Sequence, residues 1–409
     1  MRSSSRSLPP TARGAVFAAS MMLLAVCRVA PCLGSDHLDT PTVIADPRAD
    51  IGDVYAWMSP AARELNLVMT IVGHSFSDKV RYIFHVDSGP SFGHTTASSV
   101  IECRFPARTV AQCELGDVDS ARGEASGAAG LAGAKGRLRV FAGLRDDPFF
   151  NNVKGTRAAY QKAFDALKNG AQVDSAGCPS FAPEVVRAIA YEWRHTDGGP
   201  ASNFLAGWTS SAIVISVDVE AVRKGGKMLA VWGATVLGGR QLDREGRPLT
   251  ANALLGLLAP EDVSNSLKEQ YNAATPADSA RFIPEIQKSL GLYDAFDGKC
   301  GNQLLAQDAA APQARYRALA TVLADDRLWV NSASGRCTQL FAVELANLTG
   351  QAGWGADCGG RAPDYDAANV YRSLLVDGTG FSIDDGLHAD ERPPSSAVFP
   401  FLAPAVGAP

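Results

Sequence analysis

The sequence LNLVMTIVGHSFSDKVRYIFHV, residues 65–86, indicates the fold class of this chain. It contains two short runs of β-branched, aromatic and other apolar residues, Leu65–Val72 and Val80–Val86, which partly alternate with polar positions. Runs of this length and composition are typical of β-strands. Further strand-like runs are Ser99–Arg104, Thr109–Glu114, Arg137–Ala142, Ala212–Val219 and Met228–Val236.

Helical periodicity dominates the rest of the chain, and the composition shifts toward helices beyond Leu249. The helix-like segments are Thr156–Asn169, Phe181–Trp193, Pro260–Ala274, Pro276–Asp297, Gln313–Val330 and Thr338–Leu348. We therefore expect an α+β fold, with an antiparallel β-sheet or sandwich-like core from the N-terminal half. The helices should be concentrated in the C-terminal half.

The domain organisation follows from the lack of a polar linker between these halves. We expect one large α+β domain over residues 35–409. Within it, residues 35–250 are β-rich, residues 251–375 are helix-rich, and residues 376–409 form an acidic, Pro-rich tail. A Gly/Ala/Ser-rich stretch, Gly123–Gly136, is predicted to be a mobile loop.

The charge balance excludes one broad class of function. The chain has 409 residues and a formal net charge of −5, and it shows no long Lys/Arg cluster beyond its first residues. A general nucleic-acid binder needs a basic surface, so we expect no nucleic-acid partner. A protein partner and the oligomeric state are left open by the sequence.

The N-terminus reads as an export signal covering residues 1–34. Arginines 2, 6 and 13 precede an apolar run, Ala15–Val29, and small residues near Gly34 and Ser35 suit cleavage. The apolar run is too short for a spanning helix. We expect a periplasmic or extracellular protein with no membrane span after cleavage. The alternatives are an uncleaved interfacial anchor, or lipid attachment at Cys27 or Cys32.

Six cysteines remain after this cleavage, and an even number in an exported chain favours disulfides. Cys103 and Cys113 flank a short turn between strand-like runs, so we expect them to pair. The pairing of Cys178, Cys300, Cys337 and Cys358 is left open. None of the six has CxxC spacing, which argues against a thiolate zinc site.

The run SDHLDTPTVIADPRADIGDVYAW, residues 35–57, carries the densest set of potential metal ligands. The candidates are His37, Asp39, Asp46, Asp50 and Asp53. A Pro-broken loop can fold several carboxylates around a hard cation such as Ca²⁺, which takes six to eight oxygen ligands. A histidine ligand would suit a transition metal instead. The competing interpretation is that these acids form turns and cap backbone groups.

A second acidic run, GLRDDPFF at residues 143–150, places Arg145 beside Asp146 and Asp147. The two carboxylates could join a metal site. The alternative is a buried bidentate ion pair with Arg145, with the two phenylalanines as an apolar plug.

Two later motifs complete the candidate site residues. In DREGRPLTAN, residues 243–252, Arg244 and Arg247 could hold an anionic ligand or neutralise the protein's own carboxylates. In DDGLHADER, residues 384–392, His388 lies among four carboxylates, so it is a further metal candidate. The alternative for this run is a solvated acidic loop.

Familiar enzyme templates are absent from the sequence. It contains no GxSxG elbow, HExxH motif, P-loop, dinucleotide fingerprint or CxxCH haem site. No nucleotide or haem cofactor is therefore expected.

Taken together, these motifs resemble the domain-of-unknown-function family 4331, whose exported bacterial members carry similar runs in the same order. The matching segments are DHLDTP (36–41), ADPRAD (45–50), DVYAW (53–57), FAGLRDDPFF (141–150), DREGRPL (243–249) and FPFL (399–402). The opening run departs from the family pattern, with Leu-Asp-Thr in place of Arg-Glu-Ala. The resemblance implies an exported bacterial protein without an assigned activity.

The sequence is compatible with three functions. The first is an exported protein that binds a divalent cation, with Ca²⁺ favoured, through its acidic loops. The second is an extracytoplasmic enzyme with a carboxylate or histidine general base and arginines that hold an anion. The third is a binding protein for another exported protein.

Overall fold

Two antiparallel β-sheets form the core of the computed structural model, which describes residues 38–306, 311–350, 355–380 and 382–405. Sheet A has the order β1 (Ile51–Met58), β2 (Glu64–Ile71), β11 (Thr209–Asp218), β8 (Leu138–Asp146) and β7 (Leu131–Ala132). Sheet B has the order β13 (Arg240–Glu245), β12 (Met228–Leu237), β3 (Val80–Gly89), β4 (Ala97–Ala107), β5 (Val110–Leu115) and β6 (Asp119–Glu124), with β14 (Leu328–Asn331) also paired to β12. A separate two-residue pairing joins β9 (His195–Thr196) to β10 (Gly199–Pro200).

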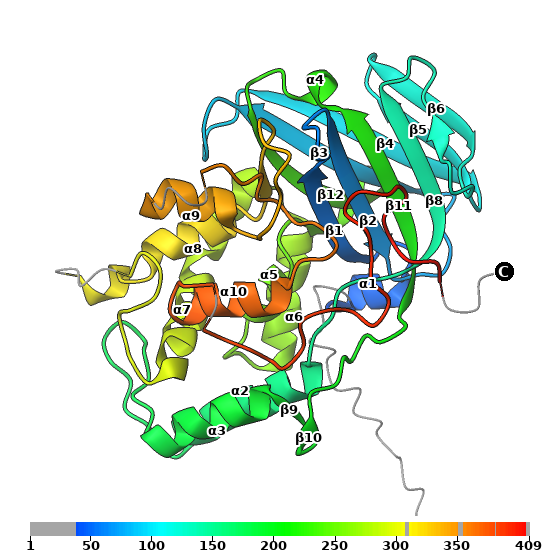
Figure 1. Ribbon diagram of the computed structural model, residues 1–409. Helices are drawn as coiled ribbons and strands as arrows, with labels where there is room; N and C mark the ends of the chain where they lie inside the picture. Colours follow the sequence, from blue (N-terminus) through cyan, green and yellow to red (C-terminus); the bar gives the residue numbers. More distant parts are fainter. Residues whose placement is uncertain (1–37, 307–310, 351–354, 381, 406–409) are drawn as a thin grey trace, which may run out of the picture. The chain divides into compact units, whose positions relative to one another are not determined.

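The two sheets pack face to face, as the surroundings of Gly233 on β12 show. A Cβ atom there would lie 2.6 Å from Cε of Met69 and 3.0 Å from Cγ2 of Val54, both on sheet A. Every residue of β1 is buried, because one face meets sheet B and the other is covered by later segments. The expected sandwich-like core is thus confirmed (Figure 1).

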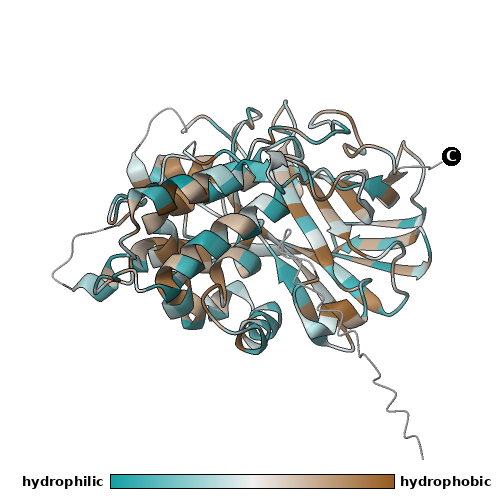
Figure 2. Ribbon diagram, turned by 90° about the horizontal axis from the view of Figure 1, so that it is seen from below, coloured by the Kyte–Doolittle hydropathy of each residue, from teal (hydrophilic) through white to brown (hydrophobic). Residues whose placement is uncertain are grey.

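Helices gather beside the sheets, mainly from the C-terminal half of the chain (Figure 1). The α-helices are α1 (Pro41–Ala45), α2 (Val153–Lys168), α3 (Pro183–Trp193), α4 (Val219–Val222), α5 (Thr250–Leu254), α6 (Glu261–Asn272), α7 (Ile283–Asp294), α8 (Arg317–Ala324), α9 (Ala342–Thr349) and α10 (Ala367–Val376). Short 3₁₀ turns are η1 (Pro276–Phe282), η2 (Ala295–Asp297) and η3 (Pro312–Ala314). Figure 2 shows hydrophobic and hydrophilic residues side by side on these helices, which is the pattern of helices with one buried face. The expected α+β class is confirmed.

Several local predictions need correction. The predicted helix Gln313–Val330 ends at Ala324. Two residues later, Asp326 has a positive φ of 42°, and the end of the predicted segment belongs to β14. Pairing with β12 therefore outweighs helical periodicity there. The predicted loop Gly123–Gly136 contains β7, and the helix α10 had no counterpart among the predicted elements.

Three disulfides lie within the described residues. They join Cys103 to Cys113, as predicted from the sequence, Cys178 to Cys300, and Cys337 to Cys358. The first crosses from β4 to β5 at a directly opposed pair. In the part of the chain that the structure describes, no helix has the length and apolar character to cross a membrane.

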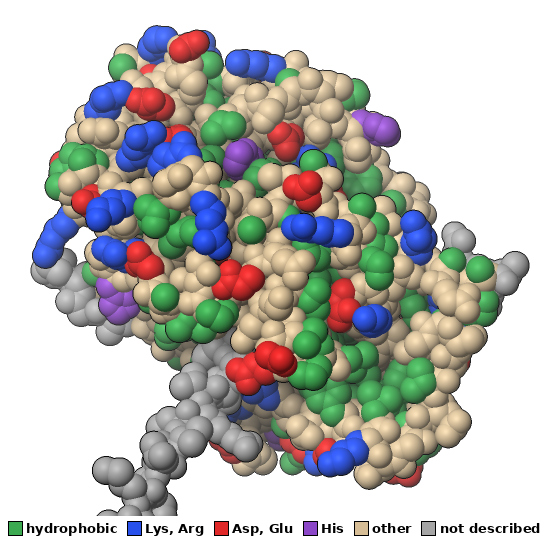
Figure 3. Space-filling model, turned by 180° about the vertical axis from the view of Figure 1, so that it is seen from behind, with side chains coloured by type: hydrophobic (Ala, Val, Ile, Leu, Met, Phe, Trp, Pro, Cys, Tyr) green, Lys and Arg blue, Asp and Glu red, His purple; other side chains and the backbone are tan. Residues whose placement is uncertain are grey.

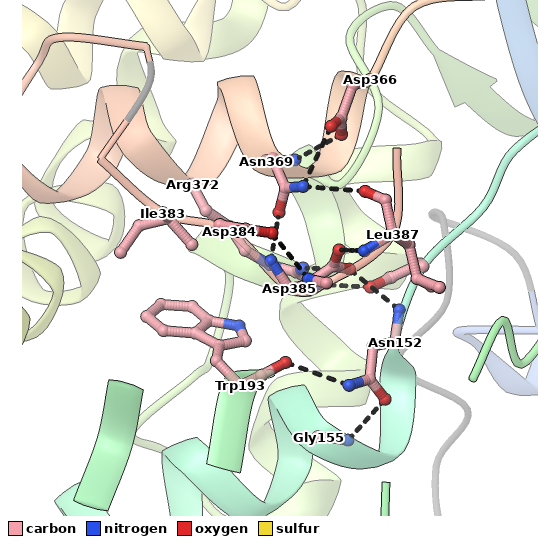
Figure 4. A network of polar contacts seen from close by, with 12 residues as sticks. Asn152, Gly155, Trp193, Asp366, Asn369, Arg372, Ile383, Asp384, Asp385 and Leu387 are labelled. Carbon is pink, nitrogen blue, oxygen red and sulfur yellow. Dashed lines mark hydrogen bonds and ion pairs between the residues drawn. The ribbon is translucent and has the colours of Figure 1, made fainter. Parts of the chain in front are cut away.

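The C-terminal tail is irregular but is fixed to the domain by buried polar contacts (Figure 4). Asp385 is 1% exposed, and its carboxylate accepts a hydrogen bond from the backbone N–H of Asn152 at 3.0 Å. Its own N–H donates to Asn369 of α10 at 2.9 Å. Further on, Phe401 packs edge-on against Trp57 of β1, with ring centroids 4.8 Å apart. The tail therefore covers sheet A and ties it to the helices.

Candidate functional site

Three buried carboxylates from separate segments meet at the beginning of β1. Asp39 precedes α1, Asp50 precedes β1, and Asp243 lies on the edge strand β13; their exposed fractions are 6%, 0% and 2%. The backbone N–H of Ile51 donates to Asp243 at 2.7 Å, and that of Leu38 donates to Asp50 at 2.9 Å. We call Asp39, Asp50 and Asp243 the acid cluster.

Burial and mutual repulsion raise the pKa of every member of the acid cluster. Burial raises the pKa of Asp39 to about 6, and the positive charge of Lys268 only partly offsets this. Burial, followed by the charge of Asp39, raises the pKa of Asp50 well above its usual value. Burial, followed by the charges of Asp50 and Asp39, does the same to Asp243. The three carboxyls therefore favour states in which bound protons or a cation reduce their negative charge.

Two oxygens of the acid cluster lack a hydrogen-bond donor. Oδ2 of Asp39 and Oδ1 of Asp50 are buried and accept no hydrogen bond from the described residues. The hydroxyl of Thr40, the residue after Asp39, is also buried without a partner. A buried polar atom without a partner is costly, so these atoms mark a place where a ligand would be stabilised.

Helix α6 supplies a positive charge that acts on Asp39. Lys268 is 5% exposed and donates to the side-chain oxygen of Asn252. One turn later, the amide of Asn272 lies 3.5 Å from Asp39. The next residue, Glu269, instead raises the pKa of Asp39 through its negative charge. Local negative charge therefore exceeds local positive charge when all groups are ionised.

A second set of buried acids has an arginine at its centre. Arg361 is 1% exposed and lies 2.5 Å from Asp53 and 3.8 Å from Glu245. Its guanidinium also stacks on the ring of Tyr55, whose hydroxyl donates to Asp147 at 3.2 Å. We call these five residues the arginine cluster. Asp53 therefore forms a buried ion pair, which neither the metal interpretation nor the turn-and-cap interpretation had anticipated, and Asp147 lies in the same polar network.

A glycine pair explains how Arg361 reaches β1. Gly359 and Gly360 both have φ of +63°, a conformation that other residues rarely adopt. A Cβ on Gly360 would come within 2.1 Å of the carbonyl oxygen of Ala56. This close approach lets Arg361 exchange two backbone hydrogen bonds with Ala56, at 2.8 and 3.0 Å. The guanidinium of Arg361 is thereby placed beside Asp53 of β1.

Asp146 belongs to a third group, next to the C-terminal tail. Its nearest cation is Arg392, at 3.6 Å, and burial raises its pKa. Burial and the neighbouring Glu391 raise the pKa of Asp390 to about 8. The expectation that Arg145 pairs with the adjacent acids is wrong, because alternation along β8 directs it away from Asp146 and over the ring of Phe141.

The remaining predicted residues lie apart from these groups. Asp46 is half-exposed and pairs with Arg48 at 2.8 Å. His388 is exposed, 3.6 Å from both Asp366 and Asp384 but through different ring nitrogens. His37 lies outside the described residues.

Arg244 and Arg247, the two arginines of the DREGRP motif, neutralise acids from the helical half. The guanidinium of Arg247 lies 2.9 Å from Glu344, and that of Arg244 lies 3.8 Å from Asp326. Neither contact involves the acidic runs at residues 35–57 and 143–150.

The acids predicted as one metal site are therefore divided among separate places. In the described ranges, the only three metal-ligating side chains with atoms within 4.8 Å of one another are Cys178, Asp294 and Cys300. The two sulfurs are bonded to each other, so they cannot act as thiolate ligands. Asp294 is in addition hydrogen-bonded by Gly301, Gln303 and Tyr316. This group is therefore a weak metal site.

Several residues in or beside these clusters were not predicted from the sequence, among them Asp243, Lys268 and Arg361. Asp243 opens the DREGRP motif, of which only the arginines were predicted as site residues. Lys268 shares a helix face with Tyr271 and Asn272, three and four positions on, and this spacing is the signal that could have found it. Arg361 follows a Gly-Gly pair, which marks a tight backbone approach.

Comparisons of the chain with protein-family models, with curated proteins and with solved structures found no match. The resemblance to family 4331 therefore stays a prediction from the motifs.

Proposed function

We propose that this chain is an exported protein that binds a divalent cation, with Ca²⁺ favoured, at the acid cluster. The observation that carries the proposal is the pair of buried oxygens without donors, on Asp39 and Asp50, among three carboxyls whose pKa values are all raised. Such a group is stable only when protons or a cation reduce its charge.

The donor set favours a hard cation. Every side-chain ligand in the cluster is an oxygen, and the unpartnered hydroxyl of Thr40 adds another next to Asp39. Ca²⁺ accepts six to eight oxygens in flexible geometry, whereas Zn²⁺ prefers nitrogen and sulfur. Backbone carbonyls and water would complete the coordination.

Binding requires a local movement. The cluster is not among the side-chain sets with ligand atoms within 4.8 Å of one another, so its oxygens are spread more widely than one ion needs. Asp39 lies in the irregular segment before α1, while Asp50 and Asp243 are held by backbone N–H groups. We expect Asp39 to move toward the other two when the cation binds.

The test is calcium titration of chelator-treated protein, followed by calorimetry and by thermal unfolding. Ca²⁺ should raise the unfolding midpoint, because a ligand that binds only the folded state stabilises it. The variants Asp50→Asn and Asp243→Asn should lose this response. Asp46→Asn is the matched control, since it removes a carboxylate from the same run but outside the cluster.

The opposite results would remove the proposal. A midpoint that does not change with Ca²⁺, together with no heat of binding, would mean that the cluster holds protons only. In that case Asp50→Asn should stabilise the protein at neutral pH, since the amide needs no proton to become uncharged. An Asp50→Asn variant that keeps the full calcium response would place the cation elsewhere.

A further inference from the structure

A cavity of about 380 Å³ lies at the beginning of α10, where the segment before α9 meets the C-terminal tail. Helix α10 and its N-cap contribute Asp366, Asn369 and Val370 to the lining, and the tail contributes Ile383 and Asp384. Figure 4 shows Asp366 and Asn369 beside this part of the tail. The volume is within the range of small-molecule sites.

Part of the cavity lining is apolar. It is formed by the side chains of Leu340, Val370 and Ile383. Leu340 is buried, and the other two are half-buried, so each of these two keeps some surface that a ligand would cover. A ligand with a short aliphatic body would bury apolar surface here, which a metal ion or a purely polar ligand would not do.

The acid Asp366 gives the cavity its negative charge. Its carboxylate caps α10 by accepting the backbone N–H of Asn369 at 3.2 Å, and burial raises its pKa. His388 lies 3.6 Å from both Asp366 and Asp384, which is too long for a hydrogen bond. Asp384 is already paired with Arg194 at 3.0 Å. Asp366 is therefore the acid that a cationic ligand would stabilise most.

A buried amide without a hydrogen-bond partner adjoins the same cavity. Gln339 is 9% exposed, and its side-chain nitrogen has no acceptor among the described residues. Gly380, which also lines the cavity, has a φ of +78°, and a Cβ atom there would lie 3.1 Å from this nitrogen. A ligand oxygen that accepts from the amide would remove the cost of the unpaired donor. Because the nitrogen is buried, we expect the amide to rotate toward the ligand.

These features select among ligand classes. An anion would be repelled by Asp366 and Asp384. A metal ion would lack ligands, because the acids and the histidine of the cavity are not among the described sets with ligand atoms within 4.8 Å of one another. An organic cation matches the acid and the apolar lining together. A primary ammonium group carries three N–H donors, which suit a carboxylate.

We propose that this cavity binds a small primary amine that has a short aliphatic body and an uncharged carbonyl group. The ammonium group contacts Asp366, the body packs against Leu340, Val370 and Ile383, and the carbonyl accepts from Gln339. The ligand is either a free small molecule or the N-terminal residue of a peptide, since both present the same groups. The site shares no residue with the acid cluster and does not depend on cation binding there.

Calorimetric titration of the full chain tests this proposal. The probes are leucinamide and γ-aminobutyramide, which carry the ammonium and the carbonyl at two different spacings. Isoamylamine and propylamine lack the carbonyl, the N-acetylated amides lack the charge, and the free amino acids add a carboxylate. At least one of the two amides should bind, and its three counterparts should bind about tenfold more weakly.

A peptide arm separates the two sources of the ligand. Binding of leucyl-glycinamide as tight as that of the better amide would assign the N-terminal residue of a peptide. Much weaker binding of the dipeptide would assign the free small molecule. The proposal would be overturned if neither amide binds, or if an N-acetylated amide binds as well as its parent.

Two variants locate the site. Asp366→Asn removes the charge but keeps a good helix cap, so it should weaken amine binding about tenfold with little change in the thermal midpoint. Gln339→Leu should bind the amide no better than the amine that lacks the carbonyl. Asp364→Asn is the matched control, because Asp364 is exposed and does not line the cavity. Equal amine binding by Asp366→Asn and this control would overturn the proposal.

Discussion

The acid cluster and the arginine cluster draw on the same two segments yet neutralise their carboxylates differently. Each takes one acid from the beginning of β1 and one from β13: Asp50 and Asp243 in the first, Asp53 and Glu245 in the second. Arg361 lies between the acids of the arginine cluster. In the acid cluster, Lys268 only partly offsets the raised pKa of Asp39, and it is hydrogen-bonded to Asn252.

This difference separates a completed ion pair from a site that still needs a counter-charge. A buried arginine keeps its positive charge at every physiological pH, because it does not lose its proton. A cluster without such a group must respond to the solution, through protons or cations. Whether a buried acid indicates a ligand site therefore depends on whether a counter-ion of the protein already neutralises it.

Among the substitutions that test this difference, Arg361→Met should lower the free energy of unfolding the most. The substitution keeps much of the side-chain volume but leaves Asp53 and Glu245 buried without their arginine, which costs about 3–5 kcal/mol. Urea unfolding measures the loss. A change below about 1 kcal/mol would mean that the two acids take up protons at little cost, and the distinction between the clusters would fail.

The pH dependence of stability should come from the acid cluster. A carboxyl whose folded pKa is raised stabilises the fold fully below its unfolded pKa, and this stability is lost as pH rises through the folded pKa. For Asp39 the window runs from 3.8 to about 6. Each pKa unit corresponds to about 1.36 kcal/mol, so the free energy of unfolding should fall by roughly 3 kcal/mol across this window.

Unfolding in urea between pH 4 and pH 7, with and without Ca²⁺, measures this loss. The calcium-free protein should become less stable as pH rises, and Ca²⁺ should reduce the slope because it replaces the protons. The Asp39→Asn variant should show a shallower slope than the unmodified chain. Equal slopes in the two proteins would show that Asp39 does not titrate in this window.

Tyr55→Phe should have a smaller effect within the arginine cluster. It removes the hydroxyl that donates to Asp147 at 3.2 Å while keeping the ring under Arg361. Loss of one buried hydrogen bond to a charged group costs about 1.5–3 kcal/mol. Chemical unfolding at pH 7 should detect it, and an unchanged midpoint would mean that water replaces the hydroxyl.

Arg48→Gln should have the smallest effect, because its ion pair with Asp46 is exposed. Surface pairs contribute about 0–1 kcal/mol, and salt screens them further. The same unfolding assay in low and high salt checks this. A loss as large as that of Arg361→Met would show that burial is not what separates the pairs. Figure 3 shows many charged side chains of both signs on one face of the molecule, where similar weak pairs are expected.

The fold class was accessible from the sequence, whereas the grouping of the acids was not. Alternation in runs such as Leu65–Val72 is a local signal, and it identified most strands of the two sheets. Asp50 and Asp53 are three positions apart, yet they enter different clusters. Their partners, Asp243 and Arg361, come from segments whose approach depends on strand pairing and on a glycine turn.

Local patterns also misjudged the tail. The run DDGLHADER reads as a solvated acidic loop, but Asp385 and Asp390 are 1% and 6% exposed. Arg372 of α10 lies 3.6 Å from Asp385, and Asn203 donates to Asp390 at 3.2 Å. These partners lie 13 and 187 positions from the acids, so no local periodic pattern links them.

The glycine turn before Arg361 also makes the first strand depend on a late part of the chain. Arg361 donates to the carbonyl of Val54, 307 positions earlier in the chain. Ribosomes add residues in order, so Asp53 exists without its counter-ion until most of the protein has been made. A chain that ends before residue 361 would therefore lack the ion pair that neutralises Asp53 in the interior.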